Sequence, residues 1–336
     1  MAAQILSTHT PALFQEAVRE AAKLLCAGEV VALPTETVYG LAANALDPAA
    51  VAKIYGLKGR PAHNPIIVHV ASLDQARQCA AAWPASAALL ARAFWPGPLT
   101  FVLPRAALIP DMVTAGGPTV GLRWPSHPFM QAVIRACGFP LAAPSANLSN
   151  QISPTNAEHV RAQLGDRLAL IVDGGQAQVG IESTVLDLTV TPPRILRPGM
   201  IHADSLGAVL GQAPTTGGIS GTSHLKSPGL LQKHYAPRAP LVVFGWENDG
   251  ELRTMIAGHA IPVDQCRIIA HTRIPASFGA QNVSVIPHDA EAFARALYAE
   301  LHRCDETGAR LIVVEAPPET LEWSGIRDRL RRAAAP

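Results

Sequence analysis

Two cations separated by a single glycine are the first residues of this 336-residue chain that could do chemistry. Lys58 and Arg60 flank Gly59, and Pro61 and Pro65 follow shortly afterwards. A glycine lets a ligand approach the backbone, and arginine binds phosphate oxygens in a two-pronged manner. This turn could therefore hold a triphosphate, although lysine and arginine are usually exposed and a solvated loop is the plainer interpretation.

A second polar pair, Ser145 and Asn147, follows the short apolar run Leu141–Ala143. Two side chains spaced in this way after a strand can emerge on the same side, at the sheet edge where ligands of open α/β proteins gather. An ordinary turn with side-chain-to-backbone hydrogen bonds explains the pair equally well. Together the two pairs favour an anion-binding cleft.

Three further features stand beside apolar runs. Arg123 ends the run Thr119–Arg123, where it could bind a substrate carboxylate or simply form a surface ion pair. His69 lies in an apolar segment, where a hydrogen-bonded core histidine is more common than a catalytic one. The loop Thr35-Glu36-Thr37 suits hydroxyl or metal binding, but also ordinary turn chemistry.

Several familiar catalytic motifs do not occur in the sequence. It contains no GxxxxGK[ST] phosphate loop, no HExxH, no GxSxG and no kinase signature set. Any nucleotide chemistry must therefore use another way of holding phosphates.

Alternating strands and helices are expected to position these residues. Apolar runs predict strands at 30–33, 66–68, 99–103, 119–123, 141–143, 168–172, 183–188 and 194–197. Caps and helical spacing predict helices at 11–27, 73–82, 85–94, 128–137 and 156–164, and one from Asp47-Pro48 to about Tyr55, which leaves Lys58 in a loop. Few true βαβ repeats occur, so we expect an open, twisted, mixed α/β sheet rather than a barrel.

The composition changes near residue 211, which predicts three regions. Residues 1–210 form the first domain, and the Gly-, Ser-, Thr- and Pro-rich stretch 211–240 is expected to be an ordered linker. Strand and helix patterns alternate again over 241–336, which predicts a small, Rossmann-like parallel α/β domain. No GxGxxG follows its first strand, so no dinucleotide fingerprint is present.

Overall composition narrows the class of protein. The formal net charge is +1, which argues against a dedicated nucleic-acid coat. No apolar run approaches the length of a membrane span, and the N-terminus does not read as a secretory signal. The five cysteines contain no CxxC pair, so we expect a reducing, cytoplasmic location and no membrane partner.

Six segments taken together match motifs of one family: PTETVYGL (34–41), KGRPAHNP (58–65), APSAN (143–147), ESTV (182–185), LRPG (196–199) and SPG…HYAP (227–237). In order and spacing the chain resembles the YrdC/Sua5 family over most of residues 12–240. The added linker and C-terminal region are similar to those of the long, Sua5-type members. The resemblance implies a YrdC-like catalytic domain over 1–210, a lid over 211–240 and a Sua5-type C-terminal domain over 241–336.

Members of this family are threonylcarbamoyl-AMP synthases. The resemblance implies that L-threonine, bicarbonate and ATP react to threonylcarbamoyl-AMP and pyrophosphate, with Mg²⁺ whose ligands the sequence leaves unknown. It also implies that the product passes to a tRNA threonylcarbamoyl transferase for the t6A modification, with at most a weak contact to tRNA itself. No protein nucleophile is required, because alignment and charge neutralisation do the work.

The resemblance also assigns site residues. Its Lys-x-Arg and Ser-x-Asn signature falls on Lys58, Arg60, Ser145 and Asn147, which would line the triphosphate. The residues implied to hold threonine are Thr35, His69, Arg123, Ser183 and the main chain near Ala143. The further residues implied to contact the nucleotide are Asn64, Thr119, Ser153, Arg197 and Tyr235, the last as part of a lid that excludes water.

The linker departs from the family pattern, since Leu230 replaces the methionine of the frequent SPGM motif, and this puts a role of Lys233 in doubt.

Two other classes of protein stay open. An RNA-binding module would bind RNA in a strongly salt-dependent way, but the near-neutral charge and the lack of aromatic platforms argue against it. A carbamoyl-transfer domain of the hydrogenase-maturation type would carry zinc-finger cysteines and an acylphosphatase region, neither of which is visible.

Overall fold

The computed structural model describes residues 3–217, 225–229 and 234–335, which form two compact units. The first unit comprises Met1–Ser149 and Ser153–Leu230, and the second comprises Asn150–Ile152 and Leu231–Pro336. The boundary falls inside the predicted linker, of which residues 218–224 and 230–233, including Lys233, lie outside the described residues. The functional division into catalytic domain, lid and C-terminal domain stays a prediction.

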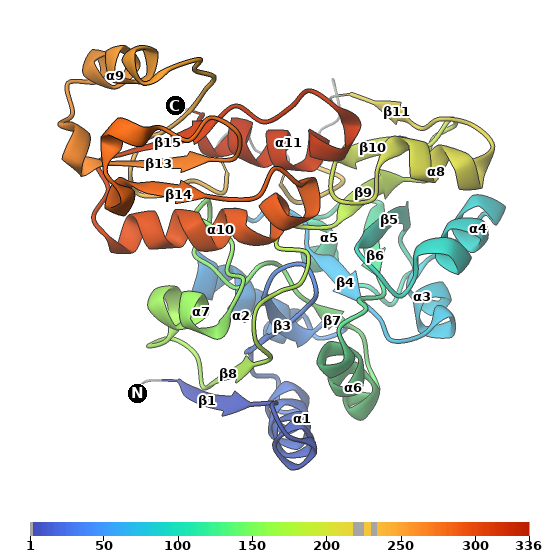
Figure 1. The fold of residues 1–336 in the computed structure, drawn as a ribbon. Helices are drawn as coiled ribbons and strands as arrows, with labels where there is room; N and C mark the ends of the chain where they lie inside the picture. Colours follow the sequence, from blue (N-terminus) through green and yellow to red (C-terminus); the bar gives the residue numbers. More distant parts are fainter. Residues whose placement is uncertain (1–2, 218–224, 230–233, 336) are drawn as a thin grey trace. The chain divides into compact units, whose positions relative to one another are not determined.

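The first unit is built on a mixed sheet (Figure 1). Its strands are β1 (Gln4–Ser7), β2 (Val31–Leu33), β3 (Gly40–Asn44), β4 (Ile67–His69), β5 (Leu99–Pro104), β6 (Thr119–Arg123), β7 (Leu141–Ala142), β8 (Leu170–Asp173), β9 (Thr184–Asp187), β10 (Arg194–Arg197) and β11 (Thr215–Thr216). Its helices are α1 (Pro11–Cys26), α2 (Pro48–Lys58), α3 (Leu73–Cys79), α4 (Ala85–Phe94), α5 (Asp111–Thr114), α6 (Pro128–Cys137), α7 (Ala157–Leu164) and α8 (Ala203–Leu210).

Strands far apart in the sequence lie side by side in this 11-stranded sheet. Their order is β1-β8-β2-β3-β7-β4-β6-β5-β9-β10-β11. Strand β4 pairs in parallel with β6, so that His69 lies beside Arg123, whereas β5 runs antiparallel to β6 and parallel to β9. The expected open, mixed α/β sheet is confirmed. It places the C-terminal ends of β4 and β6 at the same edge of the sheet as the start of β9, which lies on the far side of β5.

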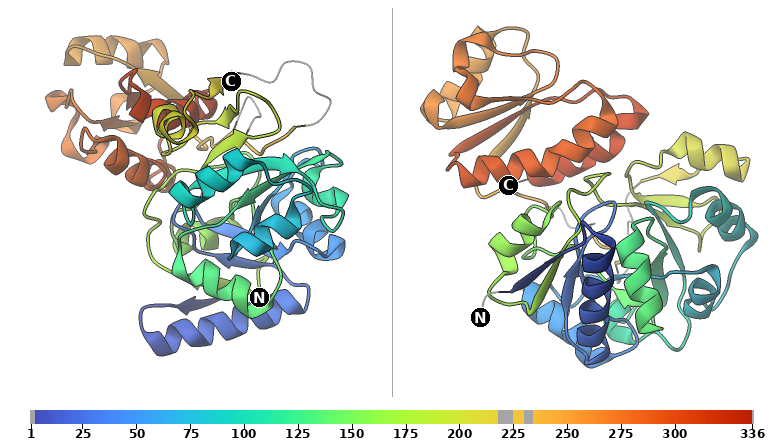
Figure 2. Two further views of the ribbon diagram at one scale, coloured as in Figure 1. Left: turned by 90° about the vertical axis from the view of Figure 1, so that its right-hand side faces the viewer. Right: turned by 60° about the horizontal axis from the view of Figure 1, so that its bottom comes forward.

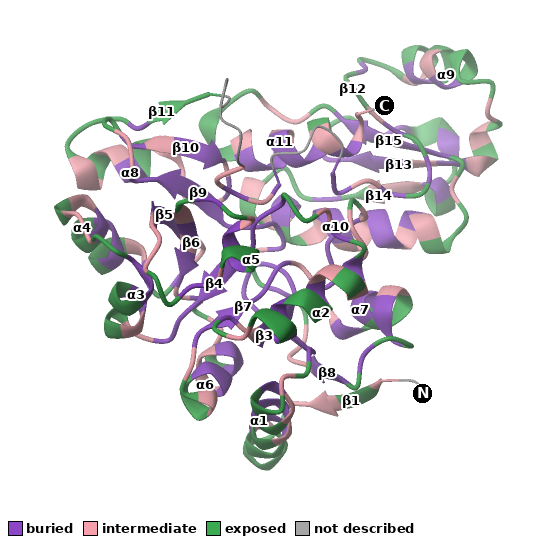
Figure 3. Ribbon diagram, turned by 180° about the vertical axis from the view of Figure 1, so that it is seen from behind, coloured by how far each residue is buried: buried purple, intermediate pink, exposed green. Residues whose placement is uncertain are grey.

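Both faces of the sheet are covered. Within β2, Val31 and Leu33 join one apolar cluster and Ala32 joins another, as the two-residue period of a strand requires. On one face α1 and α6 lie next to each other (Figure 2), and the rings of Phe14 and Phe129 meet edge to face at 5.2 Å. The strands are mostly buried, while helices such as α1 turn an exposed side outward (Figure 3).

The structure corrects the predicted end of one helix. Helix α2 does not stop near Tyr55 but continues to Lys58, where Gly59 ends it in the left-handed conformation at φ 59°. Gly56 is accommodated inside the helix, so the glycine that acts as the stop signal is the second one. Lys58 is therefore the last residue of a helix and not part of a loop.

Three elements of the first unit do not follow from the sequence pattern. Strand β1 is short and half exposed, and α5 is a single turn. Strand β3, with the sequence GLAAN, consists of residues with weak strand preference and forms because it lies between β2 and β7. Tertiary pairing overrides local preference in β3.

The second unit is a small parallel α/β domain. Its strands β12 (Leu241–Phe244), β13 (Cys266–Ala270), β14 (Val283–Val285) and β15 (Leu311–Glu315) are parallel and lie in the order β12-β15-β13-β14. Its helices are α9 (Asp249–Gly258), α10 (Ala290–Glu306) and α11 (Ser324–Ala333), with the 3₁₀ turns η1 (Val263–Gln265), η2 (Ala276–Phe278), η3 (Ala280–Asn282) and η4 (Leu321–Trp323). The predicted parallel α/β fold is confirmed.

Candidate functional site

The loop after β2 is held in a tight turn by its own hydroxyl group. Pro34 follows the last residue of β2, and the next polar residues are buried. Thr35 Oγ1 donates to the carbonyl of Val38 at 2.6 Å and accepts the main-chain N–H of Thr37 and of Val38. This local turn fixes the direction in which the side chains of Glu36 and Thr37 leave the loop.

Arg123, at the end of β6, is bound to this loop. Its Nη2 lies 2.8 Å from Oε1 of Glu36, its Nη1 donates to Thr37 Oγ1 at 2.8 Å, and its Nε donates to the carbonyl of Gly97 at 3.3 Å. Arg123 is 4% exposed and Glu36 is 6% exposed. The predicted carboxylate-binding residue thus already has a carboxylate of the protein beside it. The sequence places Glu36 in a loop suited to hydroxyl or metal binding but does not predict that it pairs with Arg123.

The charge of Glu36 follows from its surroundings. Burial raises the pKa of this carboxyl group, but Arg123 and the main-chain N–H of Ser126, which donates to Oε1 at 3.0 Å, outweigh burial and hold the pKa below its usual value. Glu36 is therefore ionised at neutral pH.

His69 lies beside Arg123 in the register of β4 and β6. Burial and the neighbouring Arg123 lower its pKa to about 3, although Glu36 and the carbonyl of Ile67 act in the opposite direction. The imidazole is therefore neutral, and neither ring nitrogen makes a hydrogen bond of ordinary geometry with the described residues. Buried polar atoms without such bonds are costly, and a bound ligand is one way of satisfying them.

Ser183 and Arg197 come together at the junction of β9 and β10. Ser183 Oγ lies 2.8 Å from Thr100 Oγ1 of β5, and the guanidinium of Arg197 donates to both the carbonyl and the hydroxyl of Ser183. Gly199 allows this close approach, because a Cβ there would lie 2.6 Å from the main-chain nitrogen of Thr184. One residue predicted for threonine and one predicted for the nucleotide are thus in direct contact.

Lys58 is buried and holds the loop that carries Ser145 and Asn147. Its Nζ donates at 2.5 Å to the carbonyls of both residues and at 3.2 Å to Asn147 Oδ1. Burial, followed by the nearby Arg60, pushes the pKa of Lys58 well below its usual value, against the attraction of Glu182. Three acceptors match the three N–H groups of an ammonium, so Lys58 reaches a phosphate only by exchanging one of them.

Arg60 and Asn64 also meet. Arg60 donates through Nε to the carbonyl of Asn64 at 3.0 Å and through Nη2 to Asn64 Oδ1 at 2.8 Å and to the carbonyl of Pro65 at 2.6 Å. These bonds close the turn between α2 and β4, and both residues are buried. The two cations that flank Gly59 are therefore part of the fold as well as candidates for the nucleotide.

The remaining predicted residues occupy distinct places. Ser153 Oγ donates to Glu182 Oε1 at 2.5 Å, and the main-chain N–H of Ala143 donates to the carbonyl of Ile67. Thr119 begins β6, at the opposite end from Arg123, and pairs with Pro104 of β5. Glu182 belongs to the ESTV segment, but the sequence alone does not show that its carboxylate accepts a hydrogen bond from Ser153.

Tyr235 belongs to the second unit. Its ring lies 5.9 Å from the ring of Tyr298, and the guanidinium of Arg329 lies 5.4 Å from its centroid. Its backbone has φ 62°, a left-handed conformation that is uncommon for a residue with a side chain. The prediction that Tyr235 covers the nucleotide stays a prediction.

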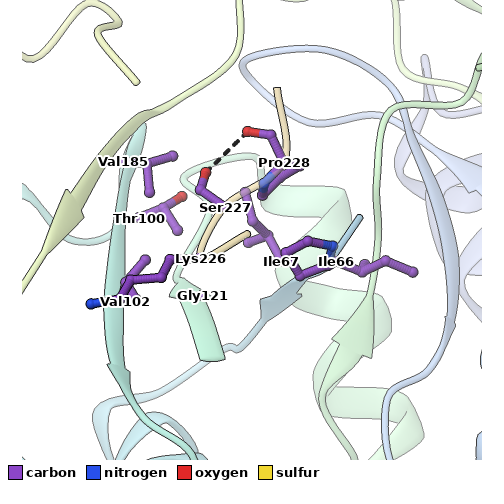
Figure 4. Close-up of a pocket in the computed structure, with 10 residues that line it drawn as sticks. Ile66, Ile67, Thr100, Val102, Gly121, Val185, Lys226, Ser227 and Pro228 are labelled. Atoms are coloured by element: carbon purple, nitrogen blue, oxygen red, sulfur yellow. Dashed lines mark hydrogen bonds between the residues drawn. The ribbon is translucent and has the colours of Figure 1, made fainter. Parts of the chain in front are cut away.

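Part of the predicted linker packs on the first unit. Lys226, Ser227 and Pro228 line a small pocket together with residues of four neighbouring strands or their flanks (Figure 4): Pro65, Ile66, Ile67, Thr100, Val102, Gly121 and Val185. Lys226 Nζ lies 2.9 Å from Oδ2 of the buried Asp187 and donates to Thr189 Oγ1 at 3.1 Å. This ion pair attaches the segment to the end of β9.

The described residues contain neither a cluster of metal ligands nor a membrane-spanning helix. Over the described ranges, no group of three or more histidine, cysteine, aspartate or glutamate side chains is arranged to hold a metal ion. None of the helices that the structure describes combines the length and the apolar character needed to span a bilayer.

Comparison with known proteins identifies relatives along nearly the whole chain. Residues 23–199 match the Sua5/YciO/YrdC family model, described as "telomere recombination", and residues 201–335 match the model of the threonylcarbamoyl-AMP synthase C-terminal domain. The chain is similar to the threonylcarbamoyl-AMP synthase of Pyrococcus abyssi, at 39% identity with 94% of each chain covered. It is also similar to the threonylcarbamoyl-AMP synthase of Bacillus subtilis, at 41% identity with 98% of this chain and 94% of the relative covered.

A solved structure agrees with these matches. The fold is similar to that of P. abyssi Sua5 complexed with L-threonine, with a TM-score of 0.90 and 37% sequence identity. The match covers 98% of this chain and 97% of the other.

Proposed function

The chain belongs to the Sua5/YciO/YrdC family, and we propose that it condenses L-threonine, bicarbonate and ATP to threonylcarbamoyl-AMP, pyrophosphate and water. The observation that carries the proposal is the buried polar cluster at the ends of β4 and β6, in a chain that matches a threonine-bound relative over almost its full length. His69 and Arg123 supply this cluster with a neutral imidazole and a guanidinium.

The amino-acid end of the reaction fits this cluster. Arg123 would bind the carboxylate of threonine, with Thr35, His69 and Ser183 around the rest of the molecule. The amine of threonine takes up the carbon of bicarbonate to form a carbamate, and water leaves. Burial of these side chains keeps bulk water away, which strengthens each electrostatic contact and protects a hydrolysable product.

The nucleotide end needs cations and alignment rather than a protein nucleophile. A carbamate oxygen attacks the α-phosphorus of ATP, and the bond to the departing pyrophosphate breaks. Lys58, Arg60 and Arg197 would neutralise the phosphate charges, with Asn64, Thr119, Ser145, Asn147 and Ser153 as further contacts. Mg²⁺ usually binds through substrate phosphates and water with few protein ligands, so it would accompany ATP. Glu182 is a buried carboxylate that contacts two members of this set, since it accepts a hydrogen bond from Ser153 and attracts Lys58.

The product is a mixed anhydride that a second enzyme must consume. We assign that step to a tRNA threonylcarbamoyl transferase that forms t6A, since an acyl-adenylate hydrolyses unless its acyl group is passed on. The near-neutral charge of the chain agrees with no more than a weak contact to tRNA.

The test is pyrophosphate release from ATP, with L-threonine or bicarbonate supplied or omitted, followed by mass analysis of the nucleotide product. We expect release only when both are present, together with a threonylcarbamoyl adenylate. Release that does not depend on threonine would indicate another acceptor. No release, with RNA retained on the protein in a strongly salt-dependent way, would overturn the proposal in favour of an RNA-binding module.

A further inference from the structure

The buried ion pair between Glu36 and Arg123 is not explained by the role assigned to Arg123. A guanidinium that only had to bind a substrate carboxylate would do so more strongly without a fixed carboxylate 2.8 Å away. Both side chains are nearly inaccessible to solvent, so water screens the pair little. The presence of Glu36 therefore lowers the affinity of this site for anions.

The other groups around the pair leave its charge balance unchanged. His69 is neutral, Thr37 Oγ1 is an uncharged acceptor for Arg123, and the main-chain N–H of Ser126 is an uncharged donor to Glu36. His127 interacts with Glu36, but burial lowers its pKa, so it is neutral at neutral pH as well. This end of the site thus contains one positive and one negative group.

One oxygen of Glu36 keeps its capacity for a further partner. Oε1 lies 2.8 Å from Arg123 Nη2 and accepts the N–H of Ser126, whereas Oε2 is buried and makes no hydrogen bond of ordinary geometry with the described residues. The negative charge of Glu36 acts on a ligand bound beside Arg123, because a buried charge acts over several ångströms in a medium of low dielectric constant.

An α-amino acid has the complementary charge distribution. It carries a carboxylate and an ammonium on one carbon and has no net charge, as does the pair that would receive it. We propose that Glu36 determines the charge specificity of the amino-acid site, so that the zwitterion of L-threonine is favoured over the same molecule without its amine. The inference rests on the proposed function and adds Glu36 as the residue that distinguishes ligands with an amine from ligands without one.

Two ligands test this directly: L-threonine and (R)-3-hydroxybutyrate, which is threonine without the amino group and carries one negative charge. Their dissociation constants are measured by calorimetry on the full-length protein, for the wild type and for Glu36→Gln. In the variant, the loss of a negative charge weakens the attraction for the ammonium and strengthens that for the lone carboxylate. We expect the preference for threonine to fall by about tenfold or more.

Two variants serve as controls. Glu36→Asp keeps the charge and should keep most of the preference. Asp187→Asn also neutralises a buried carboxylate paired with a cation, but at the end of β9 beside Lys226, and it should leave the preference unchanged. If both ligands weaken equally in Glu36→Gln, Glu36 only orients Arg123 and the inference is wrong; an unchanged preference also overturns it.

The wild-type protein supplies a test that does not depend on how the variants fold. There, (R)-3-hydroxybutyrate should bind at least about tenfold more weakly than threonine, as should threoninol, which keeps the amine and lacks the carboxylate. Equal affinity for threonine and (R)-3-hydroxybutyrate would overturn the charge specificity alone. Failure to bind threonine or to release pyrophosphate would overturn the proposed function instead.

Discussion

At the scale of single residues, the pairing of Arg123 with Glu36 means that replacing Arg123 should change both threonine affinity and stability, and the two effects can be measured separately. Arg123→Ala should weaken threonine binding far more than ATP binding, because it removes the guanidinium that would bind the carboxylate of threonine. It should also lower the free energy of unfolding by about 3–5 kcal/mol, because Glu36 is left buried without its cation. Calorimetric titration with each ligand and urea denaturation measure the two effects; equal losses for both ligands would contradict the assignment of Arg123.

The double variant Arg123→Met with Glu36→Gln separates charge from packing. It removes both charges and leaves none unpaired, so it should recover much of the lost stability but none of the threonine affinity. A double variant as unstable as Arg123→Ala would show that the stability loss comes from packing rather than from the unpaired carboxylate.

His69 makes stability depend on pH in a predictable direction. Its pKa is about 3 in the folded protein and 6.5 in the unfolded chain, so the unfolded state binds the proton first as the pH falls. The stabilisation is complete above pH 6.5 and is lost at up to about 1.4 kcal/mol per pH unit below it. Urea denaturation at several pH values should show a flatter profile for His69→Gln; identical slopes for the two proteins would contradict a buried neutral histidine.

Sequence reasoning found most of the candidate residues but not their partners. The family resemblance implies roles for His69 and Arg123, and the register of β4 and β6 places the two residues side by side. Glu36 was visible in the loop, yet no local pattern showed that it would meet an arginine 87 residues later in the chain. Such pairing is decided by strand order, which a single sequence without clear βαβ units does not specify.

At the scale of elements, the same limit shows at α2 and β3. The sequence predicts that this helix ends at about Tyr55, but Gly56 inside the helix costs only about 1 kcal/mol, and packing of α2 on β3 offsets it. The consequence for the site is direct, since the extra turn places Lys58 on the helix end, where it binds the loop of Ser145 and Asn147.

The position of Ser183, just before β9, depends on the absence of a side chain at Gly199. A Cβ at Gly199 would lie 2.6 Å from Thr184 N and 2.8 Å from the carbonyl of Glu182, both main-chain atoms that cannot move alone. Gly199→Ala should therefore displace the start of β9, lower stability by about 1–3 kcal/mol and weaken threonine binding.

Gly56→Ala is the matched control for this substitution. A Cβ at Gly56 has nothing within 4 Å, so alanine should stabilise α2 by about 0.5–1 kcal/mol without changing the affinity for threonine. Thermal melts and threonine titrations of both variants are the measurement. Unchanged threonine affinity in Gly199→Ala would remove the support for a role of Ser183.

At the scale of the whole molecule, the chain divides within the predicted linker rather than at its start. The first unit continues to Leu230 and includes Lys226, whose ion pair with Asp187 attaches the segment to β9. Strand β11 and the contacts of Lys226 both lie after the composition change near residue 211, so contacts rather than composition decide which unit a segment belongs to. A composition pattern contains no information on such contacts.

Two truncated proteins turn this difference into a measurement. A protein of residues 1–230 should be more stable than one of residues 1–210, because the shorter one loses the edge strand β11, Lys226 and the cover that Ser227 and Pro228 provide. We expect a difference of about 1–3 kcal/mol, less than the full cost of an uncompensated buried charge, since Thr189 still donates to Asp187. Both proteins should fold, because the first unit has its own apolar core.

Activity of the same two proteins tests the lid. Both lack the second unit and with it Tyr235, so both should release pyrophosphate at least about tenfold more slowly than the full chain if water exclusion contributes to the rate. Asp187→Ala in the full-length chain controls for the stability effect alone, because it removes the attachment of Lys226 but keeps Tyr235. Full activity in the protein of residues 1–230 would show that the second unit is dispensable for the reaction. Equal stability of the two truncated proteins would show that the Lys226 attachment contributes nothing to the fold.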